Sequence, residues 1–310
     1  MKKILTIGEV LVEIIATDRG NGFRSAVPLV GPFPSGAPAI FIDQVGKLGH
    51  PCAIISAVGD DDFGWVNTER LKTDGVDISG INVIAGGTTG SAFVRYREDG
   101  SRAFVFNIRH SACGTIELTD AAKQLVAEAS HLHVMGTSLY APSVIETVLS
   151  SMHAIKARGG TVSFDPNLRP EILNSPGMRE ALQSVIAETD LFLPSGDELY
   201  LFASARTEEA AVQELLAKGV KAIVLKQGAA GATYYDAKGS LTRPSMKVEE
   251  VDPTGAGDCF GATFVTLWLE GETPQTALRY ANAAGALAVT KTGPMEGASS
   301  RTEIDTFLAA

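Results

Sequence analysis

Short, almost continuously apolar runs alternate with helix-like segments through most of this 310-residue chain. A strand with one face in water alternates apolar and polar residues, so strands that are apolar throughout are covered on both faces. The alternation therefore predicts an α/β, doubly wound fold with a mostly parallel sheet and helices on both faces. The expected strands are Lys3–Ile7, Cys52–Val58, His131–Met135, Thr161–Phe164, Leu191–Leu193 and Ala222–Leu225, and the expected helices include Ala37–Leu48, Phe63–Thr73, Ser143–Arg158 and Glu208–Lys218.

Two regions break this rhythm. Ser91–Arg97 alternates small or polar with apolar residues, turns at Asp99-Gly100 and returns through Arg102–Phe106, which is typical of a β-hairpin. Val10–Ile15 also has the pattern of a strand with one polar face, and a polar loop follows it. We expect these strands to form a small sheet of their own. No internal repeat or low-complexity linker is visible, so residues 1–310 are predicted to form a single domain.

Charge and cysteine content argue against several kinds of partner and site. A formal net charge of −10 and a pI near 5.0 argue against nucleic acid or an anionic membrane as the main partner. The first apolar run is broken at Gly8-Glu9, and no apolar stretch approaches the roughly 20 residues that a membrane span needs. The three cysteines are scattered without metal-ligand spacing, so we expect buried, reduced thiols in a cytoplasmic protein.

A run rich in glycine and alanine, Val251–Gly261, leads directly into an apolar helix. The first amides of a helix have no intrahelical partner, and together with the helix dipole they bind anions. Gly255, Ala256 and Gly257 lack bulky side chains, so a phosphate can approach their amides, here called the anion hole. Asp258 would stand beside that phosphate, where its carboxylate can accept the proton of an attacking hydroxyl. The run therefore predicts a phosphotransferase.

Two other phosphate-binding motifs do not fit these residues. A Walker loop needs Gly, four residues and then Gly-Lys-Ser/Thr, and the chain contains no such run. A dinucleotide fingerprint needs GxGxxG early in a βαβ unit, whereas Gly255, Gly257 and Gly261 form GxGxxxG near the C-terminus, around an acidic residue. The remaining structural alternative is a glycine-rich turn that only begins a buried helix, with Asp258 as a stabilising carboxylate at its N-terminus.

Val251–Gly261 resembles the signature of the ribokinase-like (PfkB-type) carbohydrate kinase family, and the similarity extends over nearly the whole chain. Further matching segments are Gly8-Glu9, Ser35–Ala39, Val58–Gly64 and Phe164–Pro170. The last of these is similar to the fructokinase and 2-keto-3-deoxygluconate kinase branch. The resemblance implies a ribokinase-like fold in which a small β-sheet forms a lid over the sugar. It places this lid at about residues 10–34 and 88–112.

The resemblance also implies that ATP lies along the C-terminal third of the chain. The positions that match nucleotide-binding residues are Ser195, Lys226, Gly228, Gly231 and Asn282. The residues alone leave alternatives open. Lys226–Gly231 has the composition of a tight turn into a strand at Ala232–Tyr235, and a polar side chain on a helix of small residues can be structural.

The same resemblance implies positions that bind metal ions. Glu198 matches the acid of an Asn-x-x-Glu element associated with Mg²⁺ and phosphate, although Ser195 stands where the family has Asn. Mg²⁺ also follows from the chemistry, because it needs only one or two protein oxygens besides those of ATP. Asp252 and Thr254, together with Gly293, resemble positions around a monovalent-cation site, for example for K⁺, in some members.

For the sugar, the resemblance points to Gly36, where backbone can approach hydroxyl groups, and to Glu13, which stands where the family usually has Asp. Ile40 occupies the position of a common sugar-binding Asn. Losing that amide leaves a facing hydroxyl unsatisfied, at a cost of about 1–3 kcal/mol. The preferred sugar is therefore expected to differ from the one that the common pattern binds.

Three further residues bear on whether the sugar is charged. Arg109 and Asn107 align with lid residues that face a sugar acid in 2-keto-3-deoxygluconate kinases, and the guanidinium of Arg169 also suits a bidentate carboxylate or phosphate. Asn107 stands where that branch often has Tyr, so a neutral ketohexose such as fructose or tagatose stays open. For the hairpin arginines Arg95, Arg97 and Arg102 the simpler interpretation is a solvated strand face or pairing with the acids of another subunit.

These observations together predict an ATP-dependent sugar kinase. It would transfer the γ-phosphoryl group to a hydroxyl of a ketose or keto sugar acid, with Asp258 as base and the anion hole as electrostatic partner. A nucleoside kinase of the same fold, with an apolar slot at Ile40 and Phe41, is one alternative, and a catalytically silent sugar-binding regulator is another. A homodimer through the lid is expected from the apolar hairpin residues Phe93, Phe104 and Phe106.

Overall fold

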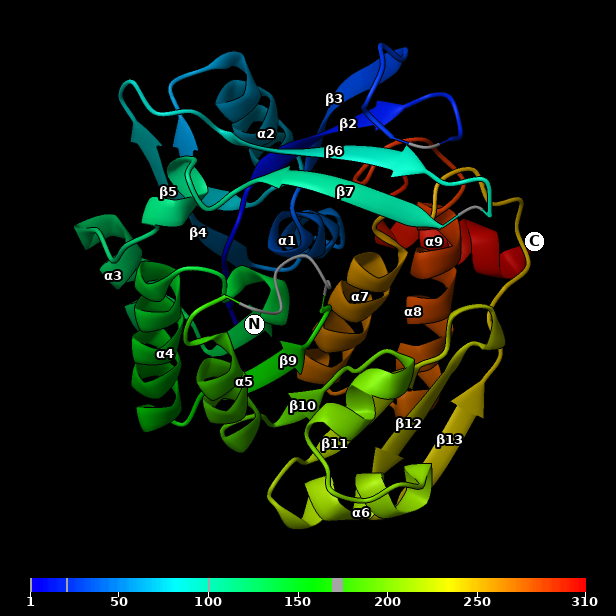
Figure 1. Ribbon diagram of the computed structural model, residues 1–310. Coiled ribbons are helices and arrows are strands. Elements are labelled where there is room, and N and C mark those ends of the chain that lie inside the picture. Colours follow the sequence, from blue (N-terminus) through cyan, green and yellow to red (C-terminus); the bar gives the residue numbers. More distant parts are fainter. Residues whose placement is uncertain (1, 21, 100, 169–174) are drawn as a thin grey trace.

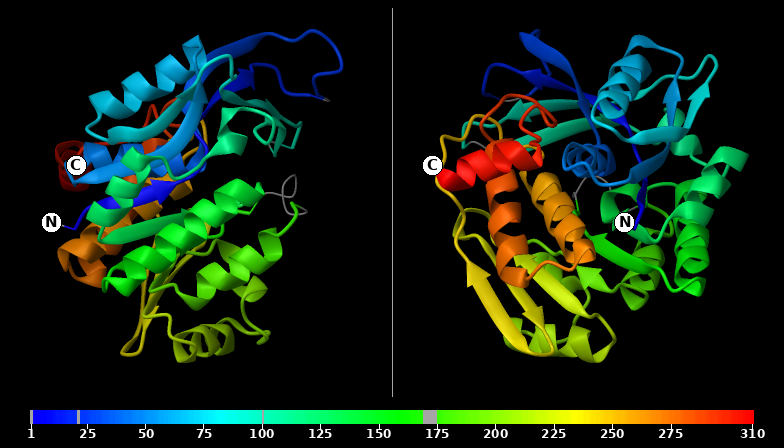
Figure 2. Two further views of the ribbon diagram at one scale, coloured as in Figure 1. Left: turned by 90° about the vertical axis from the view of Figure 1, so that its left-hand side faces the viewer. Right: turned by 180° about the vertical axis from the view of Figure 1, so that it is seen from behind.

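A computed structural model describes residues 2–20, 22–99, 101–168 and 175–310 of the chain. Within these ranges one large sheet forms the body, and helices cover both of its faces (Figures 1 and 2). In spatial order its strands are β13 (Gly239–Arg243), β12 (Ala232–Asp236), β11 (Ala222–Lys226), β10 (Leu191–Phe192), β9 (Thr161–Asp165), β8 (His131–Met135), β1 (Ile4–Ile7), β4 (Cys52–Gly59) and β5 (Asp77–Ile84).

All neighbouring strands from β11 to β5 pair in parallel, and only β12 and β13 are added antiparallel at one edge. The six predicted strands all occur, each within one residue of its expected ends. These strands are continuously apolar because both faces of the sheet are buried, as expected. In β1, Ile4 packs into one core and Leu5 into the core on the opposite face of the sheet. The predicted doubly wound, mostly parallel α/β fold is confirmed.

The helices form a layer on each face of this sheet. The layer that contains α1 (Ala37–Lys47), α7 (Ala256–Glu270) and α8 (Pro274–Ala288) is held by contacts of α7 with both of the others. Beside it lie α2 (Asp62–Thr73), against α1, and α9 (Arg301–Ala309), against α8. Figure 2 shows the opposite layer, which contains α3 (Asp120–Glu128), α4 (Pro142–Ala157), α5 (Met178–Ala187) and α6 (Glu208–Ala217).

A separate small sheet has the strand order β3-β2-β6-β7 within the described residues. Its members are β2 (Leu11–Ala16), β3 (Leu29–Ser35), β6 (Gly90–Tyr96) and β7 (Arg102–Asn107). Strands β6 and β7 are the predicted hairpin, and β2 is the predicted strand with one polar face. The sequence analysis did not predict β3, which contains two prolines, or β5 at the edge of the large sheet. Figure 1 shows the small sheet lying across the body above α1 and α7.

The two sheets meet where β1 ends, because the three residues Gly8 to Val10 lead from β1 directly into β2. Ligands of open parallel sheets bind outside the carboxyl ends of the strands, and this junction lies at such an end. None of the helices built by the described residues combines the length and apolar character that a membrane crossing demands.

Candidate active site

A pocket lies between the small sheet and the N-terminus of α7. Five of the predicted site residues line it, namely Glu13, Gly36, Thr254, Gly255 and Asp258. These residues come from β2, from the turn before α1 and from the start of α7, so segments more than 200 positions apart in the sequence converge here. The fold therefore brings the predicted phosphate-binding residues and two of the predicted sugar-binding residues to one site.

The predicted anion hole lies at the N-terminus of α7. Helix α7 begins at Ala256, and Gly255 precedes it with φ 85, a left-handed conformation that favours glycine. A Cβ atom on Gly255 would lie 2.3 Å from the carbonyl oxygen of Pro294, so no larger residue fits. The amides of the first turn have no side-chain cap among the described residues, as an anion site requires.

Asp258 lies in the first turn of α7, where its side chain is 8% exposed and lines the pocket. The side-chain amide of Asn167 donates to its Oδ1 atom at 3.1 Å. Asn167 follows β9 and has φ 40, which is uncommon for a residue other than glycine. Such strained conformations persist at functional sites because their surroundings impose them. Asn167 thus orients the predicted base, a role that the sequence analysis did not assign.

Glu9 is a second pocket residue that the sequence analysis did not assign to the site. Its side chain is 4% exposed and accepts a hydrogen bond from Ser138 Oγ at 2.7 Å. Burial raises the pKa of Glu9 to about 7, and the nearby negative charge of Asp258 acts in the same direction. The pocket therefore holds a carboxyl group that changes charge near neutral pH.

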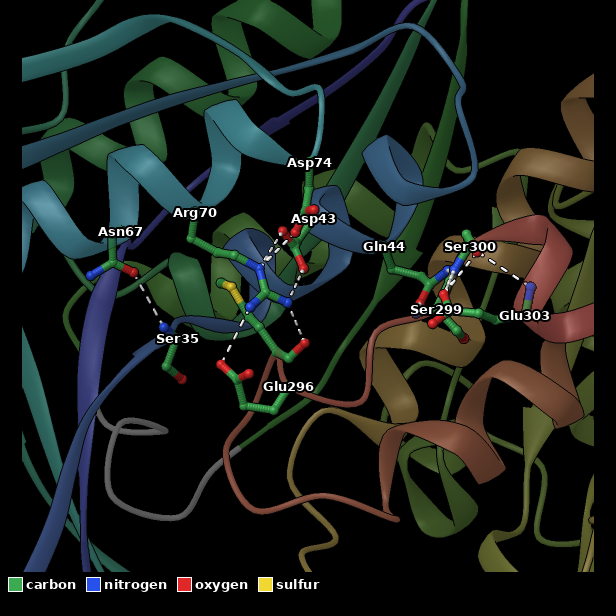
Figure 3. Close-up of polar contacts among 11 residues, drawn as sticks. Ser35, Asp43, Gln44, Asn67, Arg70, Asp74, Glu296, Ser299, Ser300 and Glu303 are labelled. Carbon is green, nitrogen blue, oxygen red and sulfur yellow. Dashed lines mark hydrogen bonds and ion pairs between the residues drawn. The ribbon is translucent and has the colours of Figure 1, made fainter.

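The sugar-side turn is fixed by its neighbours. Gly36 has φ 110, and a Cβ atom there would lie 2.4 Å from the carbonyl oxygen of Glu9. Ser35 Oγ donates to Glu13 Oε1 at 3.0 Å, and the backbone amide of Ser35 donates to Asn67 Oδ1 at 3.2 Å (Figure 3). Gly36 and Glu13 are thus held beside each other, with the Glu13 carboxylate in the pocket.

One side of the pocket is apolar. Its lining side chains are Leu11, Ile40, Phe104, Phe106 and Ile108. The rings of Phe104 and Phe106 stack with centroids 5.1 Å apart. Phe41, which the sequence analysis placed beside Ile40 in an apolar slot, lies instead in the core, stacked on His133. Consecutive helical residues point about 100° apart, so only one of the two reaches the pocket.

In the part of the chain that the structure describes, the arginine that lines the pocket is not one of those that the sequence predicted to bind the substrate. Arg109 and Asn107 are exposed and do not line the pocket, and Arg109 Nη2 donates to Ser175 Oγ at 2.8 Å. Arg169 lies outside the described residues. Arg102, interpreted above as part of a solvated face, is the one cationic side chain among the described residues that line the pocket. That interpretation was wrong for Arg102, whereas Arg97 is exposed as expected.

A cluster of charged side chains lies at the ends of neighbouring strands beside α7. Asp165 ends β9, Lys226 ends β11, and the two form an ion pair. Lys226 Nζ lies 3.9 Å from the position that a Cβ atom on Gly257 would occupy, so Lys226 reaches the anion hole. Asp165 Oδ1 is buried and has no hydrogen-bond partner in the part of the chain that the structure describes. Asp165 is a further residue that the sequence analysis did not assign.

Glu198 joins this cluster from a short 3₁₀ helix, Gly196–Leu201. Its carboxylate accepts the backbone amides of Leu168 and Ser195, each at 2.8 Å. Burial raises the pKa of Glu198, and the negative charge of Asp165 raises it further. The described residues contain no group of three or more His, Cys, Asp or Glu side chains that could enclose a metal ion by themselves. A Mg²⁺ ion held mainly by ATP needs no such group.

The remaining predicted nucleotide positions have structural contacts of their own. Gly228 begins a short 3₁₀ turn that leads into β12, as the tight-turn alternative predicts. Gly231 has φ 101, and a Cβ atom there would lie 2.1 Å from the carbonyl oxygen of Arg243. The Asn282 amide donates to the carbonyl oxygen of Pro244 at 3.2 Å. A role of these residues in binding ATP stays a prediction.

The oxygens of the predicted monovalent-cation residues accept protein hydrogen bonds. Asp252 Oδ1 accepts the hydroxyl of Tyr96 at 3.0 Å and the amide of Thr254 at 2.9 Å, and Oδ2 accepts the amide of Gly293 at 3.0 Å. Thr254 Oγ1 accepts Arg102 Nη1 at 2.8 Å. A cation there would share oxygens that already have donors, so binding of K⁺ at this place stays a prediction.

A half-buried arginine, Arg70, supports the segment on which Gly255 rests. Figure 3 shows Arg70 of α2 directed to Asp43, Asp74 and Glu296, at distances of 3.4, 2.6 and 3.3 Å. Its Nη2 atom also donates to the carbonyl oxygen of Met295 at 2.6 Å. The position of Met295, next to Pro294, is therefore set by Arg70 of α2, which Asp43 of α1 holds in place. Both helices lie more than 200 positions before Met295 in the sequence.

Comparison with known proteins agrees with this geometry. Residues 1–301 match the model of the pfkB family of carbohydrate kinases. The chain belongs to this family. Fructokinase-1 from Oryza sativa subsp. japonica is 31% identical over 314 residues, which cover 97% of this chain and 96% of that protein. The kinase class inferred from Val251–Gly261 is thus confirmed.

Two solved structures are similar to this chain over at least 99% of its length. An E. coli protein provisionally assigned as ribokinase II, solved with ATP and Mg²⁺, is 48% identical, with a TM-score of 0.94 over 100% of this chain and 99% of that one. A fructokinase variant from Vibrio cholerae, solved with fructose, ADP and potassium ion, is 25% identical, with a TM-score of 0.83 over 99% and 98% of the two chains.

Proposed function

We propose that this kinase phosphorylates a neutral ketose, of the fructose or tagatose type, with ATP as the phosphoryl donor. The observation that carries the proposal is the charge of the pocket. Glu9, Glu13 and Asp258 line it, while the described residues contribute only Arg102 as a cation. The Glu13 carboxylate beside the base accepts hydrogen bonds from sugar hydroxyls but repels a substrate carboxylate, and Glu9, whose pKa is raised to about 7, forms hydrogen bonds with hydroxyls in either charge state. The exposed position of Arg109 supports the same choice.

In the proposed reaction a sugar hydroxyl oxygen attacks the γ-phosphorus, and the bond from that phosphorus to the bridging oxygen of ADP breaks. Asp258 accepts the hydroxyl proton as the new bond forms, and Asn167 holds the carboxylate in place. The anion hole stabilises the negative charge on the oxygens in transfer. No covalent enzyme intermediate is needed, because positioning and charge neutralisation supply the catalysis.

The charged cluster fits a Mg²⁺ ion bound with ATP. Asp165 Oδ1 is a buried carboxylate oxygen without a described partner, and Glu198 adds a second carboxylate nearby. We infer that these two residues hold the ion, directly or through water, and that Lys226 faces the phosphates. When bound, Mg²⁺ neutralises charge on the β- and γ-phosphate oxygens. Gly228, Gly231, Asn282 and Ser195 are the proposed contacts to the rest of the nucleotide, and K⁺ remains a proposed ion near Asp252 and Thr254.

A nucleoside is the second candidate substrate, and the apolar side of the pocket favours it. Ile40, Phe104 and Phe106 form a surface on which a base could pack. The sugar-binding regulator finds no comparable support, because the anion hole and Asp258 keep a geometry that serves catalysis.

We further infer a homodimer through the small sheet. Phe104 and Phe106, which suggested it in the sequence, line the pocket and therefore do not need a partner subunit. The side chains that support the inference now are the exposed Leu29, Val30 and Val105 on the two edge strands β3 and β7. Light scattering at micromolar concentration tests it, and a monomeric mass would contradict it.

Three buried free cysteines are in keeping with a reducing, cytoplasmic environment.

The substrate is tested by coupled release of ADP from Mg·ATP with fructose, tagatose, 2-keto-3-deoxygluconate, ribose, inosine and adenosine. We expect the highest kcat/KM with one of the two neutral ketoses. Preference for the sugar acid would contradict the neutral-ketose proposal, and preference for a nucleoside would favour the second candidate. Binding of a sugar without turnover would support the regulator.

A further inference from the structure

Two side chains at one end of the β6–β7 hairpin reach from the small sheet to the loop before the anion hole. Tyr96 and Arg102 are direct cross-strand partners, the last pair in the register of this hairpin. The Tyr96 hydroxyl donates to Asp252 Oδ1 at 3.0 Å, and Arg102 Nη1 donates to Thr254 Oγ1 at 2.8 Å. We call Tyr96 and Arg102 the latch pair. Their acceptors lie two residues apart, and Gly255 follows the second one directly.

The acceptors belong to the structure that shapes the anion hole. Asp252 is 2% exposed, and its carboxylate accepts the amides of Thr254 and Gly293, so it joins the loop before α7 to the segment that follows α8. Pro294, next to Gly293, carries the carbonyl oxygen against which Gly255 packs. A shift of Asp252 or Thr254 therefore moves the residue that begins the anion hole.

The small sheet also carries the sugar-side residues of the pocket. Glu13 lies on β2, and Phe104 and Phe106 lie on β7, two and four residues after Arg102. Arg102 itself lines the pocket, and its guanidinium lies 5.8 Å from the centre of the Phe104 ring. A sugar that contacts this sheet thus acts on the same rigid hairpin that holds Asp252 and Thr254.

We infer that Tyr96 and Arg102 are positioning residues that align the anion hole through Asp252 and Thr254. This inference rests on the proposed kinase function. The loop from Asp252 to Thr254 has two side-chain donors from the hairpin, and these donors hold it so that the amides of residues 255–257 keep the geometry that phosphoryl transfer needs.

The kinetic test compares Tyr96→Phe and Arg102→Met with Arg97→Met. Arg97 lies close to the same hairpin but is exposed, and among the described residues its side chain donates to Ser101 Oγ and to the carbonyl oxygen of Arg102. Each latch variant should lower kcat by about tenfold, the effect of losing one aligned hydrogen bond. Tyr96 does not line the pocket, so Tyr96→Phe should also leave the KM for sugar within about threefold. Arg97→Met should match the wild type in every value.

Hydrogen exchange tests the inference without any turnover. The amides of Thr254 and Gly293 both donate to Asp252, so their exchange in the substrate-free protein should be at least several-fold faster in Tyr96→Phe and Arg102→Met. Arg97→Met should leave it unchanged. Unchanged exchange and unchanged kcat in both latch variants would overturn the inference. A wild-type protein without turnover on any sugar would instead contradict the proposed function, and the exchange result would still decide the latch. Tyr96→Phe removes a single oxygen atom, which keeps the test valid if Arg102→Met misfolds.

Discussion

The anion hole and the sugar pocket lie side by side but are built in different ways. The anion hole and Asp258 are four consecutive residues whose backbone conformation is set by one glycine with φ 85. The sugar side is assembled from side chains on β2, β7, α1 and the end of β1. In the proposed function a local motif therefore supplies the chemistry, whereas the preferred sugar depends on contacts between distant segments. The predictions below test that division.

The largest effect is expected for Asp258→Asn. The amide keeps the shape of the side chain but cannot accept a proton, so kcat should fall by about 10²- to 10⁴-fold. If Asp258 only stabilises the N-terminus of α7, turnover should stay near normal and the free energy of unfolding should change by about 0.3–1 kcal/mol. Measurement of kcat together with urea unfolding separates the two roles.

Gly255→Ala should damage both stability and turnover. The left-handed φ at this position costs an alanine about 1–2 kcal/mol. The added Cβ atom would also lie 2.3 Å from the carbonyl oxygen of Pro294, so the anion hole must shift to relieve the clash. Gly271, which ends the same helix with φ 83 and has open space around the same added atom, provides a matched control. Gly271→Ala should lose a similar 1–2 kcal/mol with normal kcat. Equal kcat in the two variants would contradict the account of the anion hole.

Glu9→Gln should change how stability depends on pH. The pKa of Glu9 is raised from 4.5 to about 7, so the folded protein disfavours the charged form. The wild type should therefore lose stability as pH rises from 4.5 through 7, by up to about 3 kcal/mol at about 1.4 kcal/mol for each tenfold change in proton affinity. Glu9→Gln removes this loss, so its free energy of unfolding relative to wild type should rise between pH 5 and pH 8.

The control for Glu9→Gln is Glu117→Gln, which makes the same change of charge at an exposed position. Its free energy of unfolding relative to wild type should not follow the same pH dependence. A flat difference between Glu9→Gln and the wild type from pH 5 to pH 8 would show that Glu9 is not held in a charge-excluding environment.

Arg109→Met should have the smallest effect. Arg109 is exposed and bonded to Ser175, so the KM for a neutral ketose should change by less than about twofold, as for other surface contacts. A substrate carboxylate bound by this guanidinium would instead give an increase above about tenfold. Initial rates over a range of sugar concentrations distinguish the two results.

The sequence predicted regular elements well because their cause is local. Six strands and four helices were placed within one residue, since continuous apolar runs report burial on both faces of a parallel sheet. Gly255 to Asp258 were found for the same reason, because helix start, small residues and acid lie in one run. β3 is largely exposed and contains two prolines, and β5 is mostly half-buried, so neither strand has a continuous apolar run.

The other site residues depend on the fold. Asn167 contacts Asp258 from 91 positions away, and Arg102 contacts Thr254 from 152 positions away. Glu9 stood out only as part of the Gly8-Glu9 segment that ends the first apolar run and matches the family, since nothing in its neighbours reveals that its side chain lines the pocket. Phe41 was placed in the pocket because it adjoins Ile40, although the helical rotation directs it into the core. Such contacts depend on the topology of the fold and on the direction of each side chain, and neither can be read from the residues that surround a position in the sequence.

The most direct test of the account is a crystal structure of the Asp258→Asn variant with a non-hydrolysable Mg·ATP analogue and the ketose that gives the highest kcat/KM. We predict one hydroxyl oxygen of the sugar about 3 Å from the side chain at position 258 and in line with the γ-phosphorus over the anion hole. Other hydroxyls of the sugar should contact Glu9 or Glu13. A sugar bound away from these carboxyl groups, or with every hydroxyl out of reach of position 258, would contradict the account.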